Sequence, residues 1–263
     1  MKILISNDDG YKAPGIHVLA RVMSRFGDVT VVAPKVQQSA MSIAVSLGGQ
    51  KLVSKELPEE GPGNWCYLDA TPASCVKFGL QYKYENRDPD LVVSGINHGS
   101  NASTGANYSA TLGAAEEAAI NGIKGIGVSL ATHDQQADLS AVEALLPGII
   151  HFLLDHWPRR RGVYYNVNFP VLPPAEIKGV QFVRQGLGHW IREFEDWDPS
   201  RAEGVDKPLE EGEKAYFMKG DFVSDDAFAD AADHLLLDEG WITIVPCQCD
   251  PTDYTELQRL KKL

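Results

Sequence analysis

Two adjacent aspartates, Asp8 and Asp9, follow the first apolar run of the chain, Ile3–Ile5. The run is typical of a buried β-strand, and Gly10 ends it. In open α/β sheets, ligands bind outside the carboxyl ends of the strands. Two carboxylates at that place, with Asn7 beside them, offer oxygen ligands to a divalent cation. Because like charges at this range repel each other, the pair requires a cation, a proton or strong hydrogen bonds.

The same residues also suit an ordinary turn, because Asp and Gly favour turn geometry. Taken alone, Asp8-Asp9-Gly10 supports the turn and the metal site equally. The remainder of the sequence favours the metal site.

The composition predicts one α/β domain, with or without an appendage, since 263 residues can bury a large core. The net charge of −12 argues against nucleic acid and anionic membranes as partners, because both bind basic surfaces. Small anionic substrates are compatible with this charge when a bound cation attracts them locally.

The sequence predicts a cytoplasmic location. No apolar run approaches the roughly 20 residues of a membrane span, and the N-terminus enters a strand without a signal-like segment. The four cysteines, Cys66, Cys75, Cys247 and Cys249, lack the paired C-x-x-C spacing of a zinc site. Reduced thiols fit them best.

Short apolar runs alternate with helical patterns along the chain. Strands rich in Val, Ile and Leu that alternate with helices predict a mainly parallel sheet with helices on both faces, the α/β class. Pro14 suits a first helical turn, Thr71 an N-cap, and Gly122 a helix end. The predicted strands are 2–7, 29–33, 65–68, 91–94, 125–130, 164–169 and 241–246. The predicted helices are 14–26, 72–80, 111–121, 139–156, 227–238 and a short one from Asp253.

The pattern changes after about Gln185. Residues 186–221 mix aromatic side chains with many charges and with Gly or Pro breaks. Such a length without clear helix predicts a protruding β-hairpin, or arm. Its aromatic side chains favour packing against another subunit, and the alternative is a self-packed lobe at the sheet edge. The predicted domains are a core at 1–185, an arm at 186–225 and a returning helix and strand at 226–263.

If the sheet is doubly wound, the loops after its strands converge on one crevice. The segment Ser94–Thr111 is rich in Asn, Gly and hydroxyl side chains and ends at a predicted helix N-terminus. Free N–H groups and the helix dipole favour a phosphate or carboxylate there. We expect Asn101, Ser109 and Thr111 to bind phosphate.

These loop residues also have simpler interpretations. Ser109 or Thr111 suits the helix N-cap, which is compatible with anion binding. Asn97 can hydrogen-bond its own loop, Ser39 can be a surface hydroxyl, and His98 can face water. The chain has no G-x-G-x-x-G, P-loop or G-x-S-x-G pattern, so dinucleotide, Walker-type and serine-hydrolase sites are not supported.

Asn7-Asp-Asp-Gly10 followed by Ala13-Pro-Gly-Ile16 resembles the opening of the SurE family, the stationary-phase survival nucleotidases. The similarity spans nearly the whole chain, and this block and Asp90–Asn97 are highly specific to the family. The other matches, in order, are Ser39, Thr71–Ala73, Cys75-Val76, Gly99, Asn101, Tyr108-Ser109, Thr111, Glu117, Asn166–Pro170 and Gly240–Pro246.

The resemblance implies a Rossmann-like core and a divalent-metal-dependent phosphatase that acts on nucleoside monophosphates. It also implies a homodimer or homotetramer built through a C-terminal arm. By position, the family's metal ligands correspond to Asp8, Asp9, Ser39 and Asn97. Oxygen-only ligands favour one Mg²⁺ or Mn²⁺ ion per subunit over Zn²⁺.

The chain departs from the family pattern at four positions. Ala40, Ala70 and Ala110 stand where glycine is common or usual, and Ala232 replaces the threonine before Asp233. If the glycine at position 110 serves to allow a positive φ, the phosphate loop differs here. None of these departures touches a predicted metal ligand.

The predicted reaction is metal-assisted hydrolysis of a phosphomonoester, a 5'- or 3'-nucleotidase reaction, with Asp8 and Asp9 as catalytic residues. One carboxylate, with Asp8 favoured, acts as base toward water, and N–H groups near Ser109 and Thr111 stabilise the phosphoryl charge.

Three other functions compete with this one. A phospho-aspartate intermediate on Asp8 lacks the Asp-x-Asp spacing. A glycosidase fails because the side chains of neighbouring strand residues point to opposite faces. The rival from a different class is a non-catalytic metal- or nucleotide-binding regulatory module in the same crevice.

Overall fold

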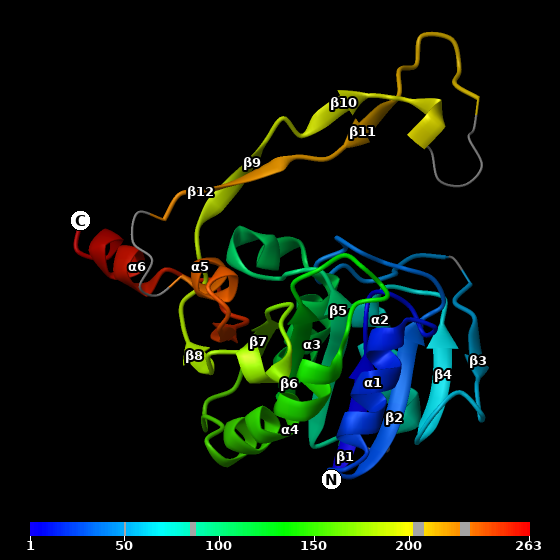
Figure 1. Ribbon diagram of the computed structural model, residues 1–263, viewed down its shortest axis with the longest axis vertical. Coiled ribbons are helices and arrows are strands. Elements are labelled where there is room, and N and C mark those ends of the chain that lie inside the picture. Colours follow the sequence, from blue (N-terminus) through cyan, green and yellow to red (C-terminus); the bar gives the residue numbers. More distant parts are fainter. Residues whose placement is uncertain (50, 85–87, 202–207, 227–231) are drawn as a thin grey trace.

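A nine-stranded sheet forms the centre of the molecule (Figure 1). The structure is a computed structural model that describes residues 1–49, 51–84, 88–201, 208–226 and 232–263. The strands of this sheet are β1 (Lys2–Ser6), β2 (Asp28–Pro34), β3 (Ser54–Glu56), β4 (Asn64–Leu68), β5 (Leu91–His98), β6 (Lys124–Leu130), β7 (Val163–Phe169), β8 (Val180–Phe182) and β13 (Ile242–Gln248). Their order is β3-β4-β2-β1-β5-β6-β7-β13-β8.

The strands from β4 to β7 in this order are all parallel. In chain order these six strands lie as 3-2-1-4-5-6, which is the doubly wound order of the Rossmann fold. β3 and β13 pair antiparallel with β4 and β7 at the two ends of the parallel block. The predicted Rossmann-like, mainly parallel sheet is confirmed, and the strand order reverses between β1 and β5.

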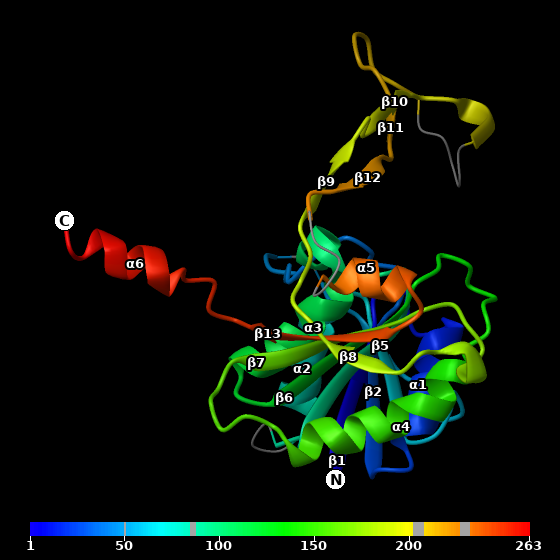
Figure 2. The same cartoon turned by 60° about the vertical axis from the view of Figure 1, so that its left-hand side comes forward.

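Helices cover both faces of the sheet (Figure 2). They are α1 (Pro14–Met23), α2 (Pro72–Phe78), α3 (Ala110–Ile120) and α4 (Ser140–Asp155). β1 shows how one strand serves both faces. Ile3 and Ile5 belong to the core that packs against α1 and α4, whereas Leu4 belongs to the core against α2 and α3. Burial on both faces explains the uninterrupted apolar run.

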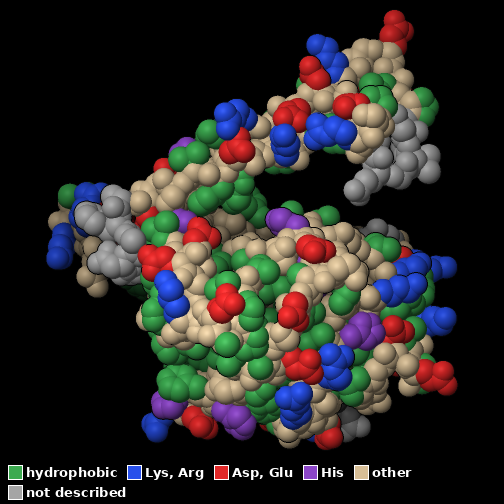
Figure 3. Space-filling model, in the orientation of Figure 1, with side chains coloured by type: hydrophobic (Ala, Val, Ile, Leu, Met, Phe, Trp, Pro, Cys, Tyr) green, Lys and Arg blue, Asp and Glu red, His purple; other side chains and the backbone are tan. Residues whose placement is uncertain are grey.

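A ribbon of two antiparallel strand pairs rises from the core as an arm (Figure 1). Its strands are β9 (Gly188–Ile191), β10 (Phe194–Asp196), β11 (Tyr216–Met218) and β12 (Asp221–Ser224). The outer part stands clear of the core, and side chains of both charge signs line it (Figure 3). The predicted protruding hairpin is confirmed, whereas its use in oligomerisation and the three domain boundaries stay predictions.

The chain returns from the arm through α5 (Asp233–Asp238) to β13. The predicted helix 227–238 is observed from Asp233, and its residues 227–231 lie outside the described part of the chain. α6 (Tyr254–Leu260) buries none of its residues and projects away from the core (Figure 2). Among the described helices, none combines the length and the apolar character that crossing a bilayer requires.

Three local features of the structure differ from the predictions. β5 continues past Ser94 to His98 after a shift in its register with β6. The helix that starts at Pro72 is α-helical only to Phe78 and continues as the π-helix Gly79–Lys83. β3 and β8 are not predicted by the sequence pattern, because they are edge strands whose mostly exposed residues form no apolar run.

Candidate active site

β1 places Asp8 and Asp9 at the point where the strand order reverses. Gly10 turns the chain there with φ +96°, a conformation that L side chains rarely adopt. At Gly15 in α1, a Cβ atom would lie 2.1 Å from the carbonyl oxygen of Ile96. The first helix therefore packs directly on the end of β5, and this close approach holds the two strand ends together.

Asp8 is a buried carboxyl group whose Oδ1 accepts a hydrogen bond from the Thr111 hydroxyl at 2.5 Å. Burial raises the pKa of Asp8 to about 7. The hydrogen bond from the Thr111 hydroxyl opposes this rise, and the neighbouring charge of Asp9 adds to it. Burial therefore favours the protonated form of Asp8 relative to an exposed aspartate, as suits a group that exchanges a proton or meets a cation.

Asp9 is held by the residue that follows Asn97. The backbone N–H of His98 donates to Asp9 Oδ2 at 3.2 Å, and His98 Nδ1 lies 3.5 Å from the same oxygen. The imidazole is fully buried, so the interpretation of His98 as a residue that faces water is wrong. Within the described residues, neither ring nitrogen has a hydrogen-bond partner.

Asn97 lies at the carboxyl end of β5, beside the end of β1. The register of β5 with β6 shifts between Ser94 and Asn97, and such bulges redirect side chains next to active sites. The Asn97 amide nitrogen donates to the carbonyl oxygen of Gly99 at 2.8 Å. The nitrogen is thus used by the loop, and the side-chain oxygen is the atom that the predicted ligand set requires.

The loop after β2 reaches the same crevice. The N–H of Gln38 donates to the carbonyl oxygen of Asp8 at 2.7 Å. Ser39 is exposed, and its hydroxyl accepts a hydrogen bond from Gln37 Nε2 at 2.9 Å. The loop carrying Ser39 therefore contacts the first aspartate, while a role of Ser39 as a metal ligand stays a prediction.

At two of the positions where this chain has alanine and the family pattern has glycine, the backbone conformations differ. Ala40 has φ +59°, a left-handed conformation that explains why glycine is common there. Ala110 is the first residue of α3 and is not among the residues with positive φ. The α3 N-terminus therefore forms without the glycine.

Ser109 and Thr111 lie at the N-terminus of α3. Ser109 is the N-cap, as predicted, and its hydroxyl accepts the N–H of Leu112 at 3.1 Å. Thr111 instead directs its hydroxyl to Asp8, so the helix N-terminus faces the carboxylates. N–H groups in the first turn of a helix have no acceptor within the helix, and they remain the predicted phosphate donors.

Asn101 belongs to a buried network that sequence reasoning missed. Its amide donates to Ser129 Oγ at 2.8 Å, and its backbone N–H donates to Asn168 Oδ1 at 2.9 Å. Asn166 donates to the Asn101 carbonyl at 2.8 Å. The sequence feature that could have predicted this network is Asn166-Val-Asn168, because residues two apart on a strand share one face. A direct contact of Asn101 with phosphate stays a prediction.

The donor set fits a hard divalent cation. Two carboxyl groups follow Asn7 directly in the chain, and Asn7 Oδ1 is buried without a hydrogen-bond partner among the described residues. A cation would offset the repulsion between the two carboxylates, and it would give an unpaired buried oxygen a partner. In the described ranges no three His, Cys, Asp or Glu residues gather into a metal cluster.

Two cavities lie away from the paired aspartates. One of about 500 Å³ is lined by Ser74, Lys77 and Glu117, and an apolar one of about 440 Å³ lies between α4 and β8. Neither contains Asp8 or Asp9. We assign the site on its chemistry, because an apolar volume cannot stabilise the charge of a phosphoryl group.

The chain is similar to known proteins over nearly its whole length. Residues 3–192 match the family model described as Survival protein SurE. A protein of Cytophaga hutchinsonii named 5'-nucleotidase SurE is 38% identical over 262 residues, which cover 99% of this chain and 95% of that protein. A protein of Christiangramia forsetii with the same name is 39% identical over 95% of this chain and 92% of its own length.

The fold is similar to a solved structure as well. The crystal structure of the SurE protein from Aquifex aeolicus superimposes with a TM-score of 0.80 at 28% identity, covering 99% of this chain and 98% of that one. Together with the match to the family model, this shows that the chain belongs to the SurE family.

Proposed function

We propose that this protein is a 5'-nucleotidase that releases phosphate from nucleoside monophosphates and depends on one divalent cation, Mg²⁺ or Mn²⁺. Relatives named 5'-nucleotidase SurE, similar over nearly the whole chain, support the reaction. The observation that carries the proposal is the buried Asp8, with a pKa of about 7, beside Asp9 and at the N-terminus of α3.

Asp8, Asp9, Asn97 and Ser39 would hold the cation. When bound, the cation supplies charge neutralisation for the carboxylates and the phosphoryl oxygens, and it lowers the pKa of water at the site. This oxygen-only set matches the preferences of Mg²⁺ and Mn²⁺.

The protein's own residues supply the remaining steps. Asp8 accepts the proton of the attacking water, and the Thr111 hydroxyl fixes the orientation of its carboxylate. The His98 N–H fixes Asp9. First-turn N–H groups of α3, next to Ser109, bind the phosphoryl oxygens and stabilise the charge that develops in the transition state.

The test is a phosphate-release panel with the purified full chain. Nucleoside 5'- and 3'-monophosphates and p-nitrophenyl phosphate are each incubated with Mg²⁺, with Mn²⁺ and with excess chelator. We expect release from 5'-monophosphates with metal and none with chelator. Thermal stabilisation by nucleotides without any phosphate release would instead establish the regulatory module, and full activity in chelator would refute metal dependence.

We also propose that the arm joins subunits into a homodimer or homotetramer. Phe194, Tyr216 and Met218 on the outer strand pair are 67%, 50% and 73% exposed, which is unusual for large apolar side chains unless a partner covers them. Light scattering is expected to give a dimer or tetramer mass, and Phe194→Ser with Met218→Ser to lower it. A monomer at micromolar concentration would refute this. A cytoplasmic location stays a prediction.

A further inference from the structure

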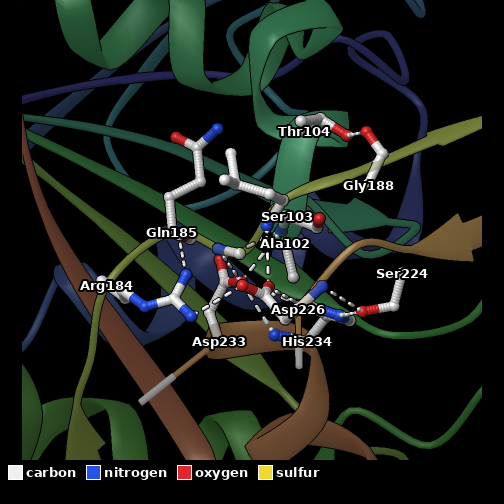
Figure 4. Close-up of polar contacts among 12 residues, drawn as sticks. Ala102, Ser103, Thr104, Arg184, Gln185, Gly188, Ser224, Asp226, Asp233 and His234 are labelled. Atoms are coloured by element: carbon white, nitrogen blue, oxygen red, sulfur yellow. Dashed lines mark hydrogen bonds and ion pairs between the residues drawn. The ribbon is translucent and has the colours of Figure 1, made fainter. Parts of the chain in front are cut away.

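Asp233 is a buried carboxylate away from the paired aspartates, at the base of the arm (Figure 4). Its Oδ1 accepts three backbone N–H groups: from Ser103 at 3.0 Å, from Gly186 at 2.8 Å and from His234 at 2.8 Å. Oδ2 lies 3.1 Å from the Ser103 nitrogen as well. One side chain thus joins the loop after β5, the start of the arm and the start of α5.

Ser103 adopts a conformation that needs such support. Its φ of +53° is left-handed, which is unfavourable for a residue with a Cβ atom. Hydrogen bonds to an ionised carboxylate are stronger than those between neutral groups, and both oxygens of Asp233 face this N–H. We therefore attribute the persistence of the strained conformation to Asp233.

Ser103 begins the 3₁₀-helix η3 (Ser103–Tyr108), which leads directly into Ser109, the N-cap of α3. The orientation that η3 takes at Ser103 therefore sets the position of the α3 N-terminus and of Thr111. Asn101 lies two residues before this point. The segment fixed by Asp233 is thus the one that carries the predicted phosphate-binding residues.

η3 also connects the arm with the loop that carries Ser39. On one side, the Thr104 hydroxyl donates to the carbonyl oxygen of Gly188 at 2.6 Å, and the ring of Tyr108 lies 5.9 Å from that of Trp190. On the other side, the N–H of Ser42 donates to the Tyr108 carbonyl at 3.0 Å. A displacement of η3 would disturb both the α3 N-terminus and the Ser39 loop.

We propose that Asp233 is a positioning residue for the active site: through Ser103 its carboxylate holds η3 in the orientation that phosphate binding at α3 requires. This inference rests on the proposed function for its catalytic consequence. It also makes the base of the arm and the phosphate site parts of one contact network, because Gly186 and Ser103 share the same carboxylate oxygen.

Asp226 provides a matched control. Its carboxylate has an exposed fraction of 6% and lies at the same arm base, where it accepts hydrogen bonds from Arg184 at 2.6 Å and from the Leu187 N–H at 2.8 Å (Figure 4). Arg184 and Leu187 precede the arm strands, and a third partner, His234, lies with its Nδ1 4.0 Å from Asp226 Oδ2. None of these partners belongs to η3. Asp226→Asn therefore weakens the arm base without releasing Ser103.

The experiment compares Asp233→Asn with Asp226→Asn in the full chain. In Asp233→Asn, an amide NH₂ group replaces one carboxylate oxygen and the charge is lost. We expect amide hydrogen exchange in residues 101–112 to be at least about tenfold faster and the inhibition constant of inorganic phosphate to rise about tenfold, with kcat falling about ten- to hundredfold. Asp226→Asn should change none of these by more than about twofold.

A rescue variant separates positioning from general destabilisation. Glycine adopts φ +53° without strain, so Ser103→Gly in the Asp233→Asn background should recover part of the phosphate affinity. The same double variant serves as the test protein if Asp233→Asn does not fold.

Equal effects of the two Asn variants, or unchanged exchange and phosphate affinity in Asp233→Asn, would overturn the proposal. Exchange does not depend on catalysis, so a wild-type protein that releases no phosphate would refute the proposed function while the role of Asp233 is still measured.

Discussion

Asp8 and Asp233 are both buried aspartates, yet their carboxyl groups differ in the hydrogen bonds and charges that surround them. Asp233 accepts three backbone N–H groups and links three segments. Asp8 accepts the Thr111 hydroxyl and lies beside the charge of Asp9, and burial outweighs its hydrogen bonds and raises its pKa to about 7. Burial alone therefore does not identify a functional carboxyl group. The distinguishing property is whether the protein itself compensates the charge.

The largest effect is expected from Asp8→Asn, which removes one charge and almost no volume. We expect phosphate release to fall by at least about a thousandfold, because the variant loses both the base and a cation ligand. Initial rates with a nucleoside 5'-monophosphate and Mg²⁺ measure this. Activity within tenfold of wild type would place the base elsewhere. Asp69→Asn, an exposed carboxylate paired with Lys35, is the control and should stay fully active.

The second prediction concerns stability without metal. The pKa of Asp8 in the folded state, about 7, lies above its ordinary 3.8. Its contribution to stability is therefore fully present below about pH 4 and is lost as the pH rises through about 7. Relative to Asp8→Asn in chelator, the wild type should lose on the order of 4 kcal/mol of unfolding free energy between pH 4 and pH 8.

Denaturant unfolding of both proteins across that pH range measures this difference. Excess Mg²⁺ at pH 8 should restore most of the lost stability to the wild type and little to the variant. A difference that does not change with pH would show that Asp8 is compensated within the protein, like Asp233.

A smaller effect is expected from Thr111→Val, which deletes the hydroxyl that donates to Asp8. A hydrogen bond to a charged group contributes about 1.5–3 kcal/mol, so kcat/KM should fall roughly ten- to hundredfold. The pH at which activity begins should move upward, because this hydrogen bond lowers the Asp8 pKa. Thr111→Ser keeps the hydroxyl and should retain most activity, and equal losses in the two variants would contradict the assignment.

The smallest effect is expected from a comparison of two residues with left-handed backbone conformation, Ser103 and Ala40. Asp233 supports Ser103, whereas Ala40 has φ +59° in the loop that contacts Asp8. Ala40→Gly should raise the unfolding free energy by up to about 1 kcal/mol, because relief of strain slightly exceeds the entropy cost of glycine. Ala44→Gly in the same loop lies outside the positive-φ residues and should lower it. Chemical denaturation of both variants decides the sign.

Much of the fold follows from local sequence. The apolar run at Ile3–Ile5, the proline at the start of α1 and the glycine after α3 each predict their elements within a few residues. The protruding hairpin follows from the loss of periodicity after Gln185. The edge strands β3 and β8 could not be predicted, because they exist through pairing with a neighbour rather than through their own composition.

The sequence predicts which residues make up the candidate site better than it predicts the contacts between them. Asp8, Asp9 and Asn97 follow from position after strands and from the family resemblance. That His98 is buried against Asp9, 89 residues earlier, depends on the register of β1 with β5. Sequence patterns do not indicate whether a single loop residue is buried, so they are equally compatible with a His98 side chain that faces water.

The sequence by itself determined the alternation of strands and helices, the arm and the identity of the oxygen donors, because hydrophobic period, turn residues and motifs are local properties. Only the tertiary structure decided that Thr111 donates to Asp8 and that Asp233 joins Ser103 to the arm. Those contacts bridge 103 and 130 residues of chain, and they form only once the sheet register and the packing of α3 and α5 bring the partners within hydrogen-bonding distance.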